Sequence, residues 1–138
     1  MTDFLDTNIL VYAYDSNDQG KQQIARQLLE NAIIEENAAI SAQVLGEFFV
    51  VVTRKIAVPL TSEEAGQLLA IFRKLPVIEI DGELVDSAVD IHQRYGVSYW
   101  DGLIIAAARQ HGCNRVLSED LQAGQKIDGV EIVNPFVQ

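Results

Sequence analysis

Asp3-Phe4-Leu5-Asp6-Thr7-Asn8 is the stretch on which the fold prediction depends. Two apolar residues lead into Asp6, and a second apolar run from Ile9 to Tyr14 begins directly after Asn8. This pattern predicts a short buried strand that ends at a carboxylate and is followed by a helix. The carboxyl end of a strand in an open α/β sheet faces the ligand crevice, which favours Asp6 as a cation ligand with Asn8 beside it. Capping is the alternative, because Thr7 or Asn8 suits a helix N-cap and Asp6 suits the positive end of a helix.

Short apolar segments alternate with amphipathic ones along the rest of the chain. Four further strands are predicted, at Ala38-Ala39-Ile40-Ser41, Val77-Ile78-Glu79-Ile80, Arg115-Val116-Leu117-Ser118 and Val130-Glu131-Ile132-Val133. Apolar residues at helical spacing separate these segments. We therefore predict an α/β fold, a single domain over residues 1–138 with a parallel five-stranded sheet sandwiched between helices. Phe48 to Thr53 stays ambiguous, because its β-propensity is strong and its apolar residues also fit one face of a helix.

The composition is that of a folded globular domain. The chain has 138 residues, of which 49% are hydrophobic, enough for one domain with a real core. A single cysteine excludes an internal disulfide and a cysteine-based zinc cluster. The start at Met1-Thr2-Asp3 lacks the basic region of a secretory signal, and no apolar run is long enough to span a bilayer. We therefore expect a cytoplasmic protein without a membrane partner.

The net charge of −10, from 20 acidic and 10 basic residues, argues against broad electrostatic capture of nucleic acid or anionic lipid. The acids either form a solvated surface or converge in part on bound cations. If the partner is a polyanion, metal ions and a few placed bases must offset the local repulsion. Arg54-Lys55 and Arg73-Lys74 are candidates for steering phosphates, and exposed helix-end bases are the alternative explanation for both pairs.

Several acids fall just after predicted strand ends. Asp120 follows the strand at 115–118 as Asp6 follows the first strand, and Glu47 lies six residues beyond Ser41. Asp101 opens a predicted helix over 99–110, where capping-box spacing from Ser98 gives it a purely structural alternative. Carboxylates gathered in one cleft repel one another, and they are tolerable if they hold hard divalent cations such as Mg²⁺ or Mn²⁺. Such ions serve in-line displacement at phosphorus.

Two other kinds of function compete with this hypothesis. Asp6 after the first strand would also suit a phosphotransfer enzyme that forms an aspartyl-phosphate, although no lysine next to a strand end offers a phosphate anchor. A non-catalytic interaction domain would use the acids as caps and surface. His92 and His111 lie on or near predicted helices without a clustered Cys, His or Ser partner, so we assign them structural roles.

Four segments, taken in order, resemble a known family: Leu5-Asp6-Thr7-Asn8, Glu47, Tyr99-Trp100-Asp101 and Leu117-Ser118-Glu119-Asp120. Together they resemble the PIN domain, and in particular the VapC-type toxin ribonucleases of bacterial toxin–antitoxin pairs. The resemblance spans essentially the whole chain. It implies a PIN-like domain that is an endoribonuclease dependent on Mg²⁺ or Mn²⁺, with RNA as its substrate.

The resemblance also implies roles for individual residues. Asp6, Glu47 and Asp101 match the acidic core, and Asp120 matches the fourth acid, with Glu119 as the alternative. Supporting polar positions are matched by Asn8, Ser41 and Ser118. The resemblance further implies a helix from Glu47 to Lys55, a homodimer, and a small antitoxin in a hydrophobic groove. Candidates for that groove, with core packing as the alternative, are Leu68, Leu69, Ile71 and Phe72.

Overall fold

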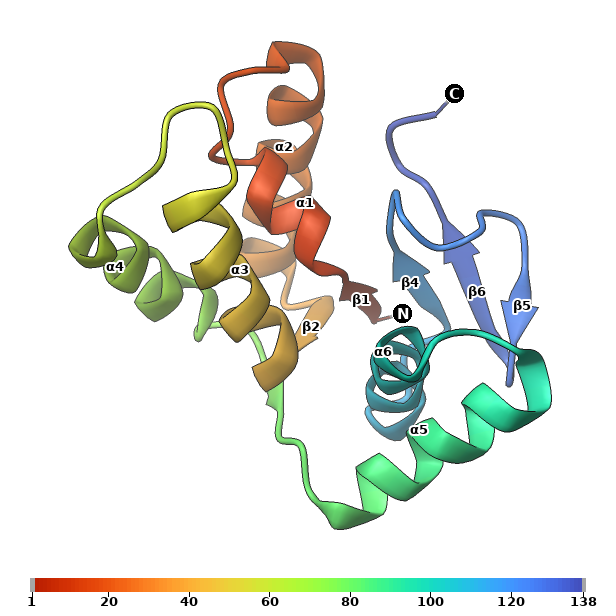
Figure 1. Ribbon diagram of the computed structural model, residues 1–138. Helices are drawn as coiled ribbons and strands as arrows, with labels where there is room; N and C mark the ends of the chain where they lie inside the picture. The colour runs from red at the N-terminus through yellow and green to blue at the C-terminus, as the bar shows by residue number, and fades with distance from the viewer. Residues whose placement is uncertain (1, 138) are drawn as a thin grey trace.

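The centre of the molecule is a six-stranded sheet, shown in the computed structural model, which describes residues 2–137 (Figure 1). The strands are β1 (Asp3–Leu5), β2 (Ala38–Ser41), β3 (Val77–Ile78), β4 (Arg115–Leu117), β5 (Lys126–Ile127) and β6 (Val130–Val133). Their order in the sheet is β3-β2-β1-β4-β6-β5. Neighbouring strands are parallel except β5, which pairs antiparallel with β6.

Helices flank this sheet, as the alternation in the sequence predicts. They are α1 (Thr7–Tyr12), α2 (Gln19–Glu35), α3 (Ala42–Arg54), α4 (Ser62–Phe72), α5 (Gly82–Tyr95) and α6 (Tyr99–Gln110). α6 packs on β2, β4 and β6 and against α5, whereas α3 packs on β2, α1 and α4 (Figure 1). The prediction of a single α/β domain with helices around a mostly parallel sheet is therefore confirmed.

The predicted number of strands is wrong by one, because the prediction missed β5. Strands β5 and β6 form a hairpin whose two linking residues, Asp128 and Gly129, have φ angles of 52° and 86°. Two consecutive residues with positive φ define the tight turn that suits the twist of a hairpin, and Asp-Gly is a favoured pair for it. Arg94 and Arg109 form ion pairs with Asp128, so the hairpin is also tied to α5 and α6.

The ambiguous segment is helical, which confirms the helix that the family resemblance implies over Glu47 to Lys55, with Lys55 as its C-cap. The Ser41 hydroxyl caps the helix by accepting a hydrogen bond of 3.3 Å from the Val44 amide. Apolar residues spaced by one turn, including the fully buried Phe48, place one face of α3 in the core. The Phe48 ring meets the Phe72 ring of α4 edge-to-face at 4.8 Å. This packing outweighs the β-propensity of the segment.

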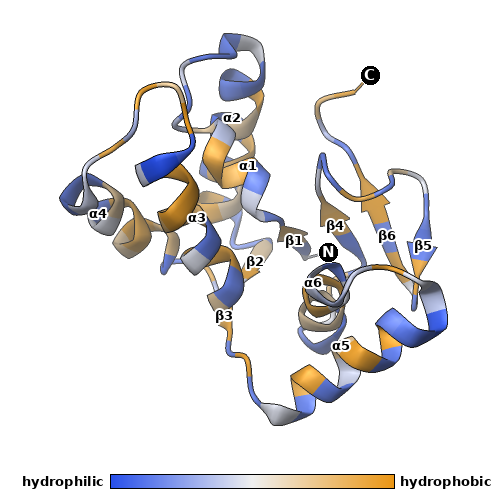
Figure 2. Ribbon diagram, in the orientation of Figure 1, coloured by the Kyte–Doolittle hydropathy of each residue, from blue (hydrophilic) through white to orange (hydrophobic). Residues whose placement is uncertain are grey.

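Side-chain burial follows the same pattern elsewhere. Hydrophobic and hydrophilic residues alternate along α5, which buries Leu84, Ala88 and Ile91 (Figure 2). The predicted capping box of α4 is present, since Thr61 and Glu64 each accept a hydrogen bond from the other's backbone amide. Among the described residues, no helix combines the length and the apolar character needed to cross a membrane.

Candidate active site

The strand order reverses direction between β1 and β4, the two neighbouring strands at the centre of the sheet. From β1 the chain goes to β2 and β3 on one side, and it then returns to β4 and β6 on the other. Ligands of open α/β sheets bind at the carboxyl ends of strands at such a point. The Asp6 amide donates a hydrogen bond of 3.0 Å to the Leu117 carbonyl, which holds the ends of β1 and β4 together. Asp6 and Ser118 consequently lie side by side.

Asp6 is both a helix cap and a site residue. Its Oδ1 accepts a hydrogen bond of 2.7 Å from the Thr7 amide, and its Oδ2 accepts one of 2.7 Å from the Ser118 hydroxyl. The residue is only 8% exposed. Burial raises the pKa of Asp6 from 3.8 to about 6, and the nearby negative charges of Glu47 and Asp120 add to this rise. The two hydrogen bonds lower the pKa and offset part of the effect.

The other predicted acids surround the same space. Burial raises the pKa of Glu47, which lies in the second turn of α3, and the charges of Asp101 and Asp120 raise it further. Burial also raises the pKa of Asp101, and the charge of Asp120 adds to that effect. The Ser98 hydroxyl accepts a hydrogen bond of 3.0 Å from the Asp101 amide, so Asp101 opens α6 as predicted. The four predicted acids thus lie near enough for their charges to influence one another.

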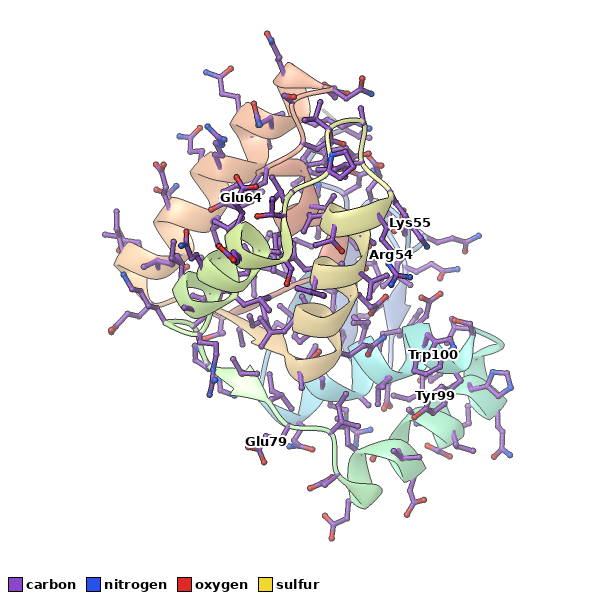
Figure 3. All side chains as sticks on the ribbon, turned by 60° about the vertical axis from the view of Figure 1, so that its left-hand side comes forward. Arg54, Lys55, Glu64, Glu79, Tyr99 and Trp100 are labelled. Carbon is purple, nitrogen blue, oxygen red and sulfur yellow. The ribbon has the colours of Figure 1, made fainter. Side chains whose placement is uncertain are left out.

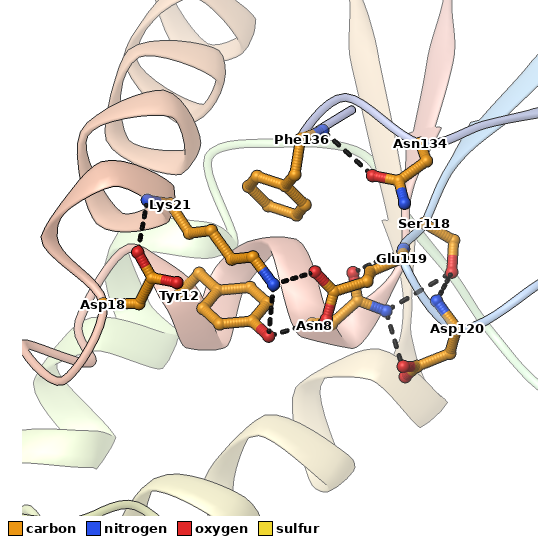
Figure 4. Close-up of polar contacts among 9 residues, drawn as sticks. All are labelled: Asn8, Tyr12, Asp18, Lys21, Ser118, Glu119, Asp120, Asn134 and Phe136. Carbon is orange, nitrogen blue, oxygen red and sulfur yellow. Dashed lines mark hydrogen bonds and ion pairs between the residues drawn. The ribbon is translucent and has the colours of Figure 1, made fainter. Parts of the chain in front are cut away.

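Asn8 connects the loops that follow β1 and β4 (Figure 4). Its amide nitrogen lies 3.4 Å from Asp6 Oδ2, 3.3 Å from Ser118 Oγ and 3.2 Å from Asp120 Oδ2. Its amide oxygen accepts a hydrogen bond of 3.1 Å from the backbone amide of Glu119. Ser118 Oγ in turn accepts a hydrogen bond of 3.1 Å from the Asp120 amide. These contacts fix the position of Asp120 relative to Asp6.

Glu119 points into a different set of contacts from Asp120 (Figure 4). Its carboxylate accepts a hydrogen bond of 2.6 Å from the Tyr12 hydroxyl and forms an ion pair with Lys21. Burial raises the pKa of Glu119, but the bonds from Lys21 and Tyr12 outweigh it and leave the pKa below its ordinary value. Asp120 therefore faces Asn8, whereas Glu119 is already neutralised by a lysine.

Ser41 is buried, at 1% exposed, at the end of β2. Its hydroxyl accepts the capping hydrogen bond from the Val44 amide. Ser41 therefore supports the site indirectly, by capping α3, the helix that carries Glu47.

A cleft of about 340 Å³ opens beside these residues. It is lined by Thr7, Asn8, Val11, Tyr12, Asp15, Glu47, Val51, Lys55, Ile56, Glu119 and Asp120. The sequence prediction missed Tyr12 and Lys21 as members of the site. No local pattern marks them, because Lys21 is separated from Glu119 by 98 residues and Tyr12 by 107.

The side chains at the site offer oxygen ligands. Four carboxylates face the same space, and the buried Thr7 hydroxyl lacks a hydrogen-bond partner within residues 2–137. This donor set, without sulfur or imidazole, fits a hard cation such as Mg²⁺ or Mn²⁺. In the same part of the chain, no three Asp, Glu, His or Cys side chains already converge closely enough to hold one ion.

Comparison with known proteins gives the class of this chain. The PIN domain model matches residues 4–126, so the chain belongs to the PIN domain family. A comparison with curated proteins finds no match.

Solved structures with the same fold include a toxin–antitoxin complex and a toxin. The fold is similar to that of a toxin–antitoxin complex from Klebsiella pneumoniae, with 20% identity, a TM-score of 0.68, and 97% of this chain and 98% of that chain covered. It is similar to VapC20 of Mycobacterium tuberculosis, a Sarcin-Ricin loop cleaving toxin, with 19% identity, a TM-score of 0.65, and 86% and 90% covered. VapBC2 of Rickettsia felis, bound to a promoter DNA fragment, gives 21% identity, a TM-score of 0.64, and 96% and 97% covered.

Proposed function

We propose that this protein is a metal-dependent endoribonuclease and the toxin of a toxin–antitoxin pair. The observation that carries the proposal is the buried Asp6 carboxylate at the switch point of the sheet, with Glu47, Asp101 and Asp120 around it. Membership of the PIN domain family and the fold shared with a toxin that cleaves the Sarcin-Ricin loop support the same function.

Each side chain has a defined task in this proposal. Asp6, Glu47, Asp101 and Asp120 would hold Mg²⁺ or Mn²⁺, which supplies activation of water and charge neutralisation at the scissile phosphodiester. Thr7 and Ser118 hold the Asp6 carboxylate in one orientation, and Asn8 holds Asp120 near it. Asp120 and Glu47 are exposed to solvent, and binding of an ion would relieve the mutual repulsion of the acids.

Asp120, rather than Glu119, is the fourth acid in this proposal. The Glu119 carboxylate is bound by Lys21 and Tyr12, so using it would require breaking an ion pair and a hydrogen bond. Glu119 instead supports the site, because its ion pair and its backbone bond to Asn8 hold the loop after β4 against α1 and α2.

The geometry disfavours a phosphotransfer enzyme with Asp6 as the nucleophile. Both Asp6 carboxylate oxygens accept short hydrogen bonds, and the residue is almost fully buried. In residues 2–137, neither a lysine nor an arginine forms a salt bridge with Asp6 that would anchor a phosphoryl group there.

The direct test of the proposed function is cleavage of total RNA with Mn²⁺ or Mg²⁺, with EDTA, and by the Asp6→Asn and Asp101→Asn variants. We expect cleavage only by the wild type with metal, and an increase in its Tm on adding Mn²⁺ that both variants lose. Undiminished cleavage by Asp6→Asn, or by the wild type in EDTA, would reject the metal site.

The toxin role and its partners are tested separately. Structures of the same fold include toxin–antitoxin complexes, which supports a small antitoxin as the partner and a paired assembly of this chain. Of the four residues predicted to form the antitoxin groove, Phe72 lies in the core and Ile71 is 39% exposed. Co-expression with the product of a neighbouring short reading frame should yield a stable complex without RNA cleavage. A chain that stays alone and active would contradict the toxin role.

A further inference from the structure

Trp100 is a large aromatic side chain left open beside the acids. It is the one tryptophan in the sequence, and it is 63% exposed. It lies in the first turn of α6, immediately before Asp101 in the chain. A tryptophan buries a large apolar area when it is covered, so leaving it open forgoes a substantial gain in folding free energy.

Trp100 has contacts through both its ring and its backbone. Tyr99 meets it edge-to-face, with ring centroids 4.9 Å apart and planes at 74°. The Trp100 carbonyl accepts a hydrogen bond of 3.3 Å from the side-chain amide of Gln43 in the first turn of α3. The backbone of Trp100 therefore links the helix that carries Asp101 to the helix that carries Glu47, and the exposed ring packs against Tyr99.

The charge of the molecule explains why such a surface would be needed. The chain carries a net charge of −10, and among the described residues that line the cleft Lys55 is the one base. Figure 3 shows Arg54, Lys55, Tyr99 and Trp100 toward one edge of the view, away from Glu64 and Glu79. An acidic protein gains little affinity for RNA from electrostatics, whereas an aromatic ring binds bases by stacking without needing positive charge.

We propose that Trp100 is the platform on which an unpaired base of the RNA substrate stacks, next to the phosphodiester held at the acids. The inference rests on the proposed ribonuclease function and assigns Trp100 the contact with an unpaired base. In a duplex the faces of the bases are covered by their neighbours, so they are not available to Trp100.

The kinetic test compares Trp100→Ala with Trp100→Phe, and Ile34→Ala serves as a matched control because Ile34 is 75% exposed on α2. We expect Trp100→Ala to raise KM for a single-stranded RNA by about 10- to 100-fold while kcat changes little. Trp100→Phe should retain most of the affinity, and Ile34→Ala should match the wild type. A KM unchanged in Trp100→Ala would overturn the proposal, as would equal cleavage of duplex RNA.

A second test does not depend on cleavage. Because the chain has one tryptophan, its fluorescence reports on Trp100 alone. Titrating the wild type in EDTA, and the Asp6→Asn variant, with a single-stranded RNA should quench the emission, whereas the duplex of the same sequence should not. Unchanged emission would overturn the inference whether or not the protein is a nuclease. Loss of dimer or antitoxin binding in Trp100→Ala, with KM unchanged, would instead place a protein on this surface.

Discussion

At the scale of single residues, the Asp6 carboxylate is ionised at a cost in folding free energy. Its pKa of about 6 lies above the ordinary 3.8, which corresponds to about 3 kcal/mol. The folded state therefore binds the proton of Asp6 more tightly than the unfolded state does. Protonated Asp6 contributes its full stabilisation of the folded state below pH 4, and this contribution is lost as the pH rises through 6.

This shift gives a prediction for the protein in EDTA. We expect Tm to fall between pH 4 and pH 7, and Asp6→Asn to be more stable than the wild type at pH 7 although it does not cleave RNA. The measurement is thermal unfolding across this pH range. The exposed Asp86→Asn variant on α5 serves as the control and should follow the wild type. An Asp6→Asn variant that loses stability with pH as steeply as the wild type would contradict the assignment.

Glu119 and Asp120 are adjacent carboxylates that the sequence does not distinguish. The groups that separate them, Lys21 and Asn8, come from distant parts of the chain. We expect Asp120→Asn to abolish the rise in Tm caused by Mn²⁺, because it removes a proposed ligand. Glu119→Gln should keep that rise and lower the Tm by a similar amount with and without Mn²⁺, because it removes the ion pair with Lys21. Titration of both variants with Mn²⁺ in a thermal unfolding assay checks this, and the opposite pattern would make Glu119 the ligand.

At the scale of elements, the contact between α5 and α6 sets where Asp101 lies. A Cβ atom added at Gly102 would be 2.7 Å from the Ala88 carbonyl oxygen, a backbone atom that cannot move aside easily. Gly102 thus allows the two helices to approach closely at the residue that follows Asp101.

We expect Gly102→Ala to lower the free energy of unfolding by about 1–3 kcal/mol, since it overpacks this contact. It should also reduce cleavage, because α6 carries Asp101. Gly66→Ala in α4 is the matched control: its Cβ meets nothing within 4 Å, and replacing a glycine inside a helix should stabilise by about 0.5–1 kcal/mol. Denaturant unfolding measures both. If the two variants were equally stable, α5 and α6 would be able to move apart enough to accommodate the added methyl group, which would contradict the prediction.

The elements also show what local sequence can predict. Capping residues and apolar periodicity were sufficient to predict α4 and α5. Thr61 is the N-cap of α4 and Gly96 is the C-cap of α5, so both signals are local to the helix that they mark. For α3, local propensity was not sufficient, because the choice of helix depends on packing against α1 and α4. Strand β5 has two residues, too few for any periodicity, and its only local signal is the pair Asp128-Gly129.

At the scale of the whole molecule, the convergence of the acids follows from topology. Parallel strands place their carboxyl ends at one edge, so Asp6 and Asp120 were predictable as neighbours once β1 and β4 were predicted. Lys21 and Tyr12, which also contact the site, were not predictable. They reach Glu119 from helix surfaces, and no local sequence pattern indicates that contact. The catalytic roles of the four acids stay predictions, to be tested by the variants above.

The net charge of −10 gives a prediction for the whole protein as an RNA binder. Each phosphate neutralised by a base contributes about −0.7 to the slope of log affinity against log salt for single strands. If contacts come mainly from Arg54 and Lys55, the slope should be about −1 to −2, shallower than for a basic RNA-binding protein. Affinity of Asp6→Asn for a fluorescent single-stranded RNA, measured across salt concentrations, checks this.

Two further variants separate charge from stacking. Lys55→Gln should flatten the slope further, whereas Trp100→Ala should weaken binding equally at every salt concentration because stacking releases no counterions. A slope steeper than about −5 would show that many more bases of this chain than Arg54 and Lys55 contact the RNA, and would contradict the prediction.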